Sequence, residues 1–160
     1  MIQNNAARSA PQAPDADGAR IAVQTRFGEL IVDPNATVRL PRGLLGYSDV
    51  HEFALANLPE ERFGQFKLLQ SLERPELSFI VVPYNLAAGQ IAREDIAGAY
   101  EALGIAPADG AVLLVVSVRK AGEAVSISVN LRAPILIDTA NRRAWQHVLT
   151  NPAYSVRHVL

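Results

Sequence analysis

The sequence contains no cysteine among its 160 residues. Disulfide bonds, thiolate zinc sites, iron–sulfur clusters and cysteine nucleophiles are therefore excluded. No apolar run approaches the ~20 residues that a membrane-spanning helix needs, and the N-terminus lacks the apolar core of a signal peptide. These absences predict a cytoplasmic protein, with no membrane contact, whose stability depends on an ordinary hydrophobic core.

Charge of either sign is not in excess. Fifteen basic residues stand against sixteen acidic ones, which gives a formal net charge of −1. Proteins that bind nucleic acid through its phosphates usually have a clear basic excess or a basic stripe, and an RNA mimic would need a strongly acidic surface. The charge balance therefore argues against direct binding to nucleic acid and against RNA mimicry.

Catalytic signatures are also missing from the sequence. It has no Gly-x-Ser-x-Gly elbow and no glycine-rich phosphate loop ahead of a helix. Its only histidines, His51, His147 and His158, are far apart and have no carboxylate at metal-ligand spacing. The sequence predicts no enzyme, no metal site and no cofactor.

Nearly half of the residues are hydrophobic, which is typical of a globular domain. Residues 1–20 differ, because they are rich in Ala, Pro, Asn, Gln and Asp and contain almost nothing apolar larger than alanine. Such a segment cannot bury enough apolar surface to offset its ordering entropy. We expect a disordered N-terminal tail over residues 1–20 and a single domain over residues 21–160.

Alternating apolar residues predict a succession of short β-strands. Residues 21–27 and 30–32 alternate on either side of Gly28, which predicts a tight hairpin. Ser48 is expected to cap a short helical turn over residues 49–52. Further strands are expected over residues 37–40, 53–58, 66–72, 77–82, 111–118, 125–129, 134–137 and 143–149.

One convincing helix is expected among these strands. Four apolar residues recur at the spacing of one helix face, and they are Ile96, Ala99, Tyr100 and Leu103. Gly104 follows at the expected helix end. Short strands in succession indicate an antiparallel barrel or sandwich, and barrel closure removes exposed strand edges. We therefore predict a mainly β fold, a small antiparallel β-barrel-like domain with one or two short helices.

Several short segments carry residues that are hard to explain by the fold alone. Residues 44–47 place bulky apolar groups in a glycine-flanked loop, and residues 70–73 put polar groups at a strand end. Residues 130–134 place a polar pair before a proline-started strand, and residues 157–158 are a basic pair near the C-terminus. Taken singly, each segment favours a structural role as a core plug, a turn cap, a bulge or a C-terminal clamp.

Taken together and in this order, the segments resemble one family, that of the flagellar assembly factor FliW. The resemblance runs over about residues 21–160. It departs from the common family pattern in having Tyr47 in place of Phe and Val159 in place of Pro. The matching stretches are residues 25–29, 40–47, 69–72, 102–105, 129–135 and 154–158.

The resemblance implies a β-barrel-like protein without catalytic activity. It implies cytoplasmic binding of two partners, flagellin and the RNA-binding translational repressor CsrA, which compete for the factor. Export of flagellin would free the factor, which would then bind the repressor at a site remote from the RNA-binding surface of the repressor. This non-competitive antagonism would couple flagellin synthesis to filament assembly.

The expected partner-binding surface follows from the same segments. An amphipathic helix or an extended terminus of flagellin would dock there, on an apolar groove or a strand edge. Exposed aromatic and arginine side chains usually contribute most of the binding free energy. The expected contact residues are Leu44, Leu45, Tyr47, Gln70, Ser71, Glu73, Asn130 and Arg132, with Arg157 and His158 as further candidates.

Two other functions stay open at this point. A closed barrel can carry a small ligand, which would need an open cavity in place of packed Val, Leu and Ile. An RNA-binding OB-like module would need aromatic residues paired on one sheet face. The five Phe, four Tyr and one Trp are instead spread along the chain.

Overall fold

The computed structural model describes residues 20–58, 60 and 63–160. The tail expected over residues 1–20 lies outside the described residues, except for Arg20. β-Strands dominate the fold, as predicted. The strands are β1 (Ile21–Thr25), β2 (Gly28–Val32), β3 (Thr37–Arg39), β4 (Glu52–Asn57), β5 (Lys67–Ser71), β6 (Ser78–Pro83), β7 (Gly110–Ala121), β8 (Ala124–Val129), β9 (Ile135–Asp138), β10 (Arg143–Gln146) and β11 (His158–Val159).

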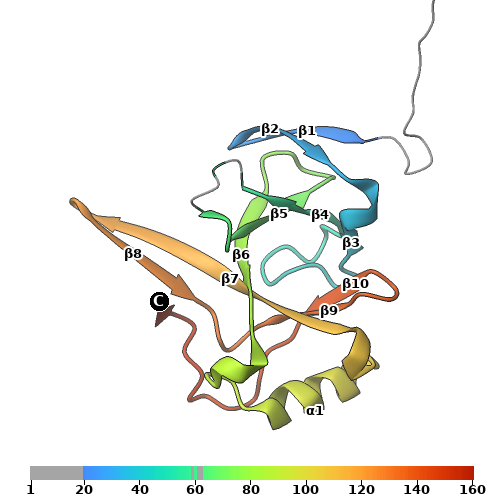
Figure 1. Ribbon diagram of the computed structural model, residues 1–160, viewed down its shortest axis with the longest axis vertical. Helices are drawn as coiled ribbons and strands as arrows, with labels where there is room; N and C mark the ends of the chain where they lie inside the picture. The colour runs from blue at the N-terminus through green and yellow to red at the C-terminus, as the bar shows by residue number, and fades with distance from the viewer. Residues whose placement is uncertain (1–19, 59, 61–62) are drawn as a thin grey trace, which may run out of the picture.

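Most of these strands form a closed ring (Figure 1). The hydrogen-bonded order is β7-β6-β5-β4-β3-β10-β9, and β9 pairs again with β7. Neighbours in the ring are antiparallel except β3 and β10, which run parallel and are joined between Arg39 and Arg143. The predicted β-barrel-like architecture is confirmed. The predicted hairpin of β1 and β2 is also confirmed, as a separate two-stranded sheet.

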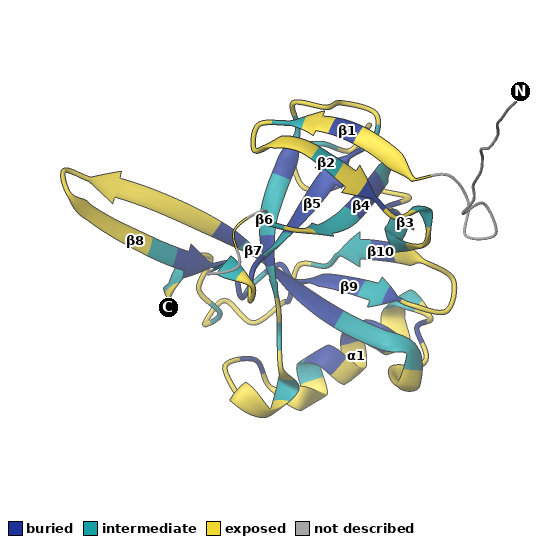
Figure 2. Ribbon diagram, turned by 45° about the horizontal axis from the view of Figure 1, so that its top comes forward, coloured by how far each residue is buried: buried dark blue, intermediate teal, exposed yellow. Residues whose placement is uncertain are grey.

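Strand β7 belongs to the ring in its first half and leaves it in its second half. Residues 110–113 pair with β9 and residues 113–115 pair with β6, whereas residues 116–121 pair with β8. The β7–β8 hairpin therefore projects from the ring as an arm, whose outer part is exposed on both strands (Figures 1 and 2). The short strand β11 pairs with the base of this arm, at Val129 and Ser128 of β8.

Buried side chains fill both the inside and the outside of the ring. The inner cluster includes Leu40, Phe53 and Ile135, of which no more than 1% is exposed. The outer cluster packs helix α1 (Arg93–Leu103) against the ring. Apolar side chains pack much of the ring interior, and a pocket of about 400 Å³ borders this inner cluster, lined in part by Val38, Leu69 and Leu113.

Helix α1 has the face predicted from the sequence. Ile96, Ala99 and Tyr100 are buried, and Gly104 ends the helix in the left-handed conformation with φ of 73°. The described residues also include short 3₁₀ turns. They are η3 (Pro34–Ala36), η5 (Leu86–Ala88) and η6 (Pro107–Asp109).

The helical turn expected over residues 49–52 is wrong, because the chain turns at Ser48 and is already in β4 at Glu52. A carboxylate that is distant in sequence explains the difference. Glu73 accepts hydrogen bonds from the backbone N–H groups of His51 and Glu52. The start of a helix would leave these two backbone N–H groups without hydrogen-bond partners, whereas in the extended chain Glu73 provides a partner for both.

Candidate functional site

The loop of residues 43–47 closes over the inner cluster and exposes one large apolar side chain. Leu44 is buried, whereas 58% of Leu45 is exposed. The backbone N–H of Tyr47 donates to the Leu44 carbonyl at 2.7 Å. The Tyr47 ring packs edge-on against Phe79, with centroids 5.4 Å apart. The loop is therefore fixed on its inner side and presents Leu45 to solvent.

Two of the predicted contact residues, Gln70 and Ser71, have no exposed area. The Gln70 side-chain amide donates to three backbone carbonyls, those of Ser71, Pro75 and Leu77. The Ser71 hydroxyl accepts the backbone N–H groups of Glu73 and Arg74. Gln70 and Ser71 thus build the turn between β5 and β6, and they can influence a partner only through the shape of that turn.

Glu73 is exposed on the same turn. The backbone N–H groups of Glu52 and His51 donate to its carboxylate and lower the pKa of Glu73 below its usual value. The N–H of Val50, the residue before His51, donates to the Tyr47 carbonyl at 3.2 Å. The hydrogen bond from His51 therefore places Glu73 only a few residues after the 43–47 loop.

Asn130 and Arg132 lie on the other side of that loop. The Asn130 side-chain oxygen accepts the N–H groups of Arg132 and Ala133 at 3.0 and 3.1 Å, which forms a local turn. Arg132 is partly buried, and its Nε atom is buried without a hydrogen-bond partner among the described residues. This turn leads directly into β9.

Gln146, at the end of β10, joins the two segments. Its side-chain oxygen accepts the backbone N–H of Leu45 at 2.9 Å, and its amide nitrogen donates to the Ala133 carbonyl at 3.1 Å. The structure therefore brings residues 43–47 and 130–134 together, as the predicted surface requires. No local pattern pointed to Gln146, because its role depends on a partner 101 residues away.

Arg157 and His158 lie apart from this loop, at the base of the arm. His158 pairs with Val129 of β8, and the nearby backbone is held by a hydrogen bond from Leu131 N–H to the Ser155 carbonyl at 2.9 Å. Arg157 is exposed and His158 is partly buried. Both residues belong to a segment that fastens the C-terminal region to β8.

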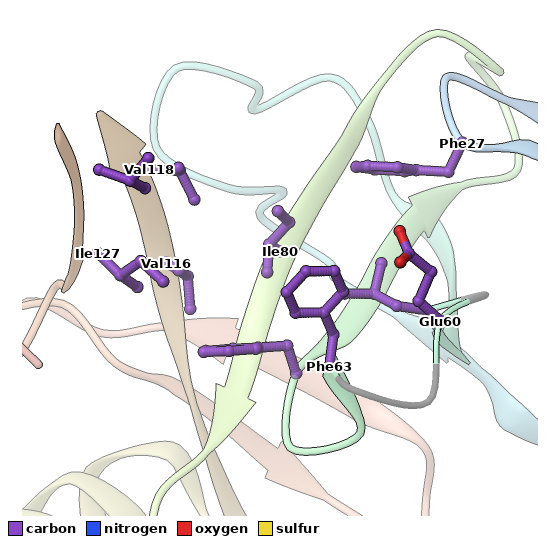
Figure 3. A pocket seen from close by; sticks show the side chains of 10 residues that line it. Phe27, Glu60, Phe63, Ile80, Val116, Val118 and Ile127 are labelled. Carbon is purple, nitrogen blue, oxygen red and sulfur yellow. The ribbon is translucent and has the colours of Figure 1, made fainter. Parts of the chain in front are cut away.

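An apolar groove of about 390 Å³ lies beside the arm, and the sequence analysis missed it. We call it the arm groove (Figure 3). One wall comes from the β7–β8 arm, and the opposite side comes from β6, the connection between β4 and β5, and the β1–β2 turn. Its lining residues are Phe27, Leu58, Glu60, Phe63, Phe66, Ile80, Val116, Val118, Val125 and Ile127.

The arm groove holds apolar side chains at its mouth that are well exposed. The exposed fractions are 38% for Phe27, 50% for Val118 and 56% for Val125. Contiguous exposed apolar surface of this kind commonly marks a binding site for a protein or ligand. The sequence predicted only that Phe27, Val118 and Val125 lie in strands, with residues 111–118 as a buried run, because the groove depends on how distant segments meet in space.

Neither a metal centre nor a helix that could span a membrane is found in the described part of the chain. No group of three or more His, Asp or Glu side chains there could hold a metal ion. None of the helices in that part is long and apolar enough to cross a bilayer. Two candidate sites remain among the described residues, the 43–47 loop with its neighbours and the arm groove.

The fold and these surfaces define a small β-barrel-like protein with exposed apolar surfaces. A sequence profile of the family described as FliW protein matches residues 21–160. The chain therefore belongs to the FliW family, a family of non-enzymatic flagellar assembly factors. The family predicted from the sequence is confirmed.

Individual relatives agree with the family profile. The chain is 37% identical over 134 residues to the flagellar assembly factor FliW of Geobacter sulfurreducens, which covers 84% of this chain and 82% of the relative. It is 34% identical to the FliW of Syntrophotalea carbinolica, over 86% of this chain and 96% of the relative. A crystal structure of the flagellar assembly factor FliW superposes with a TM-score of 0.67 at 26% identity, covering 88% of this chain and 96% of that one.

Proposed function

We propose that this flagellar assembly factor binds flagellin and CsrA in the cytoplasm and exchanges one for the other. Flagellin would occupy the factor until flagellin is exported. The freed factor would then bind CsrA at a site remote from the RNA-binding surface of CsrA. The observation that carries this proposal is the match to the FliW family over the whole domain, residues 21–160. The net charge of −1 also favours contact with protein over contact with RNA.

The contact surface proposed for these partners is centred on the 43–47 loop. Leu45 is its most exposed apolar side chain, and Tyr47, Glu73 and Arg132 border it with some exposed area. Aromatic and arginine side chains beside an apolar anchor are typical of interface positions that dominate binding. The shape of this surface would be maintained by residues beneath it or in its turns, which are Leu44, Gln70, Ser71 and Asn130. Arg157 and His158 would extend the surface toward the arm.

The variant Leu45→Asp tests this surface. Leu45 is exposed and its backbone N–H, which binds Gln146, is retained, so we expect an unchanged melting temperature. A carboxylate in an apolar contact would weaken binding of at least one partner about tenfold or more. The measurement is isothermal titration of the full chain with flagellin and, separately, with CsrA.

Ile31→Asp is the matched control. Ile31 is also an exposed aliphatic residue, with an exposed fraction of 54%, and it lies on β2 away from the loop. It should bind both partners as the wild type does. Unchanged binding of Leu45→Asp to both partners would show that the surface is wrongly assigned, and no binding by the wild type would contradict the proposed function itself.

A further inference from the structure

The outer half of β7 has a backbone edge without a strand partner. The Val112 carbonyl accepts a hydrogen bond from Tyr84, just after β6, and the Val115 carbonyl accepts one from Asn130, just after β8. Backbone groups alternate sides along a strand, so the N–H and C=O groups of Val118 and Lys120 face the β6 side. Pairing with β6 ends at Val115, and no strand in the described residues pairs with β7 on that side beyond this point.

The Ser78 end of the facing edge of β6 is already occupied. The Arg26 guanidinium donates to the Ser78 hydroxyl at 3.0 Å and to the Ser78 carbonyl at 3.4 Å. The same guanidinium lies 5.0 Å from the centre of the Phe27 ring. Arg26 therefore fastens the β1–β2 turn to β6 and holds Phe27 at the mouth of the arm groove, and the open edge belongs to β7.

This open edge borders the arm groove. Val116 and Val118 of β7 and Val125 and Ile127 of β8 line the groove from the arm, and Ile80 of β6 lies across from them (Figure 3). A strand edge beside exposed apolar side chains promotes pairing with another chain unless something covers it. Main-chain hydrogen bonds together with pockets for alternate side chains are the two features that strand addition uses.

The charges of the groove limit what can bind there. Lys120 is exposed and lies on the same face of β7 as Val118, two residues nearer the tip of the arm. Glu60 lines the opposite side, beside Phe27 (Figure 3). An occupant along β7 therefore fits best with apolar residues in the groove and an acidic residue at its end near Lys120.

A helix is the poorer occupant for this groove. It would exclude water from the N–H and C=O groups of Val118 and Lys120 and offer no backbone groups in return. Buried backbone groups left without partners destabilise a complex. An extended segment satisfies them, because every second residue of an added strand pairs with that edge.

We propose that an extended segment of a protein partner adds as a β-strand to the open edge of β7 in the arm groove. Its alternate apolar side chains pack on Val118, Val125 and Phe27, and an acidic side chain lies beside Lys120. The proposal rests on the proposed function for the identity of the partner, which we take to be flagellin, because an extended terminus of flagellin is the segment expected to dock on a strand edge. It adds the place and the backbone conformation of the contact.

Amide hydrogen exchange on the ¹⁵N-labelled full chain tests this proposal together with affinity. We expect the Val118 and Lys120 amides to exchange fast in the free protein and at least about tenfold more slowly with saturating flagellin. Val118→Asp should weaken binding of the same partner about tenfold or more, while Ile31→Asp, with a similar exposed fraction, binds as the wild type does.

The other outcomes each contradict the proposal in a distinct way. Equal affinity of Val118→Asp and wild type for both partners would exclude the arm groove as a docking site and leave the proposed function intact. Weakened binding with unchanged exchange at Val118 and Lys120 would indicate a helix docked through side chains. Slow exchange in the free protein would mean that residues 1–19 or a second copy already covers the edge, and ultracentrifugation would distinguish these two. Failure of the wild type to bind either partner would overturn the proposed function as well.

Discussion

Gly43 is the residue on which the shape of the 43–47 loop depends most directly. Its φ is 65°, in the left-handed region that favours glycine. A Cβ atom at this position would lie 2.2 Å from the Tyr47 carbonyl oxygen and 2.8 Å from the Ser48 Cα. Both neighbours are backbone atoms, so the loop itself would have to move. Leu45 keeps its position only as long as residue 43 has no side chain.

Gly43→Ala should therefore destabilise the protein and disturb the loop. We expect a loss of about 2–4 kcal/mol in the free energy of unfolding, from the strained φ and the clash together. Gly46→Ala is the matched control, because Gly46 has φ of 85° but a Cβ atom added there would meet nothing within 4 Å; it should lose only about 1 kcal/mol. Urea denaturation measures the free energy of unfolding of both variants. Equal losses would show that the approach of the Tyr47 carbonyl to Gly43 does not exclude a side chain at position 43.

The Glu73 carboxylate fixes the path of the chain at the start of β4 through its hydrogen bonds to His51 and Glu52. Hydrogen bonds from the Glu52 and His51 N–H groups lower its pKa in the folded state. A lowered pKa stabilises the fold at pH values above the usual carboxyl range, and this contribution is lost as the pH falls through the folded-state value. Glu73 is thus expected to act on stability mainly near neutral pH.

The variant Glu73→Gln should show this pH dependence. We expect it to be less stable than the wild type at pH 7, with a difference that shrinks as the pH falls below the usual carboxyl range, because the wild-type carboxylate then becomes protonated. Thermal unfolding at a series of pH values gives the measurement. Glu76→Gln, in the same turn, is the control and should follow the wild type; a difference for Glu73→Gln that is constant with pH would contradict the assignment.

Among the elements, helix α1 depends on a distant segment for its first turn. Ala92 at its N-cap provides no side-chain hydrogen bond. The Tyr154 hydroxyl instead accepts the Ala92 N–H at 3.0 Å and donates to the Asp95 carboxylate. The hydrogen bond to Asp95 raises the pKa of Tyr154. The C-terminal segment thereby serves as a cap for a helix 62 residues earlier in the chain.

Tyr154→Phe tests this capping role. It removes the hydroxyl while keeping the ring that packs on the outer cluster, so we expect a loss of about 1–2 kcal/mol in the free energy of unfolding. Faster amide exchange at the start of α1 should accompany it. Val156→Ala, at an exposed position on the same segment, should leave both quantities unchanged, and a Tyr154→Phe variant as stable as the wild type would exclude the cap.

The elements also show what the sequence could and could not predict. Alternation around Gly28 predicted the β1–β2 hairpin, and the apolar spacing from Ile96 predicted the α1 face, because both patterns are local. The extended chain at residues 51–52 depends on Glu73, which is more than 20 residues away. The parallel pairing of β3 with β10 and the arm groove likewise depend on contacts between distant segments, which periodicity does not reveal.

At the scale of the whole molecule, strand β6 separates the two docking surfaces. Phe79 packs on Tyr47 at the inner cluster, whereas the next residue, Ile80, lines the arm groove on the outside. Successive side chains of a strand point to opposite faces. The protein thus presents exposed apolar side chains at the 43–47 loop and at the arm, on the two sides of this strand.

The proposed exchange of partners also requires comparable affinities. A tenfold change in the concentration of free flagellin shifts the balance by about 1.4 kcal/mol. The affinities for flagellin and CsrA must therefore differ by no more than the range over which flagellin varies, so that neither partner occupies the protein permanently. Variants that strengthen one contact alone should disturb regulation as much as variants that weaken it.

Competition between the two partners tests the central claim most directly. The full chain is saturated with fluorescently labelled CsrA, and unlabelled flagellin is then added while the anisotropy is followed. The account predicts a fall in anisotropy to the value of free CsrA, with a midpoint that moves to higher flagellin concentration as more CsrA is present. An anisotropy that stays constant at saturating flagellin, or a chain that binds neither protein, would contradict it.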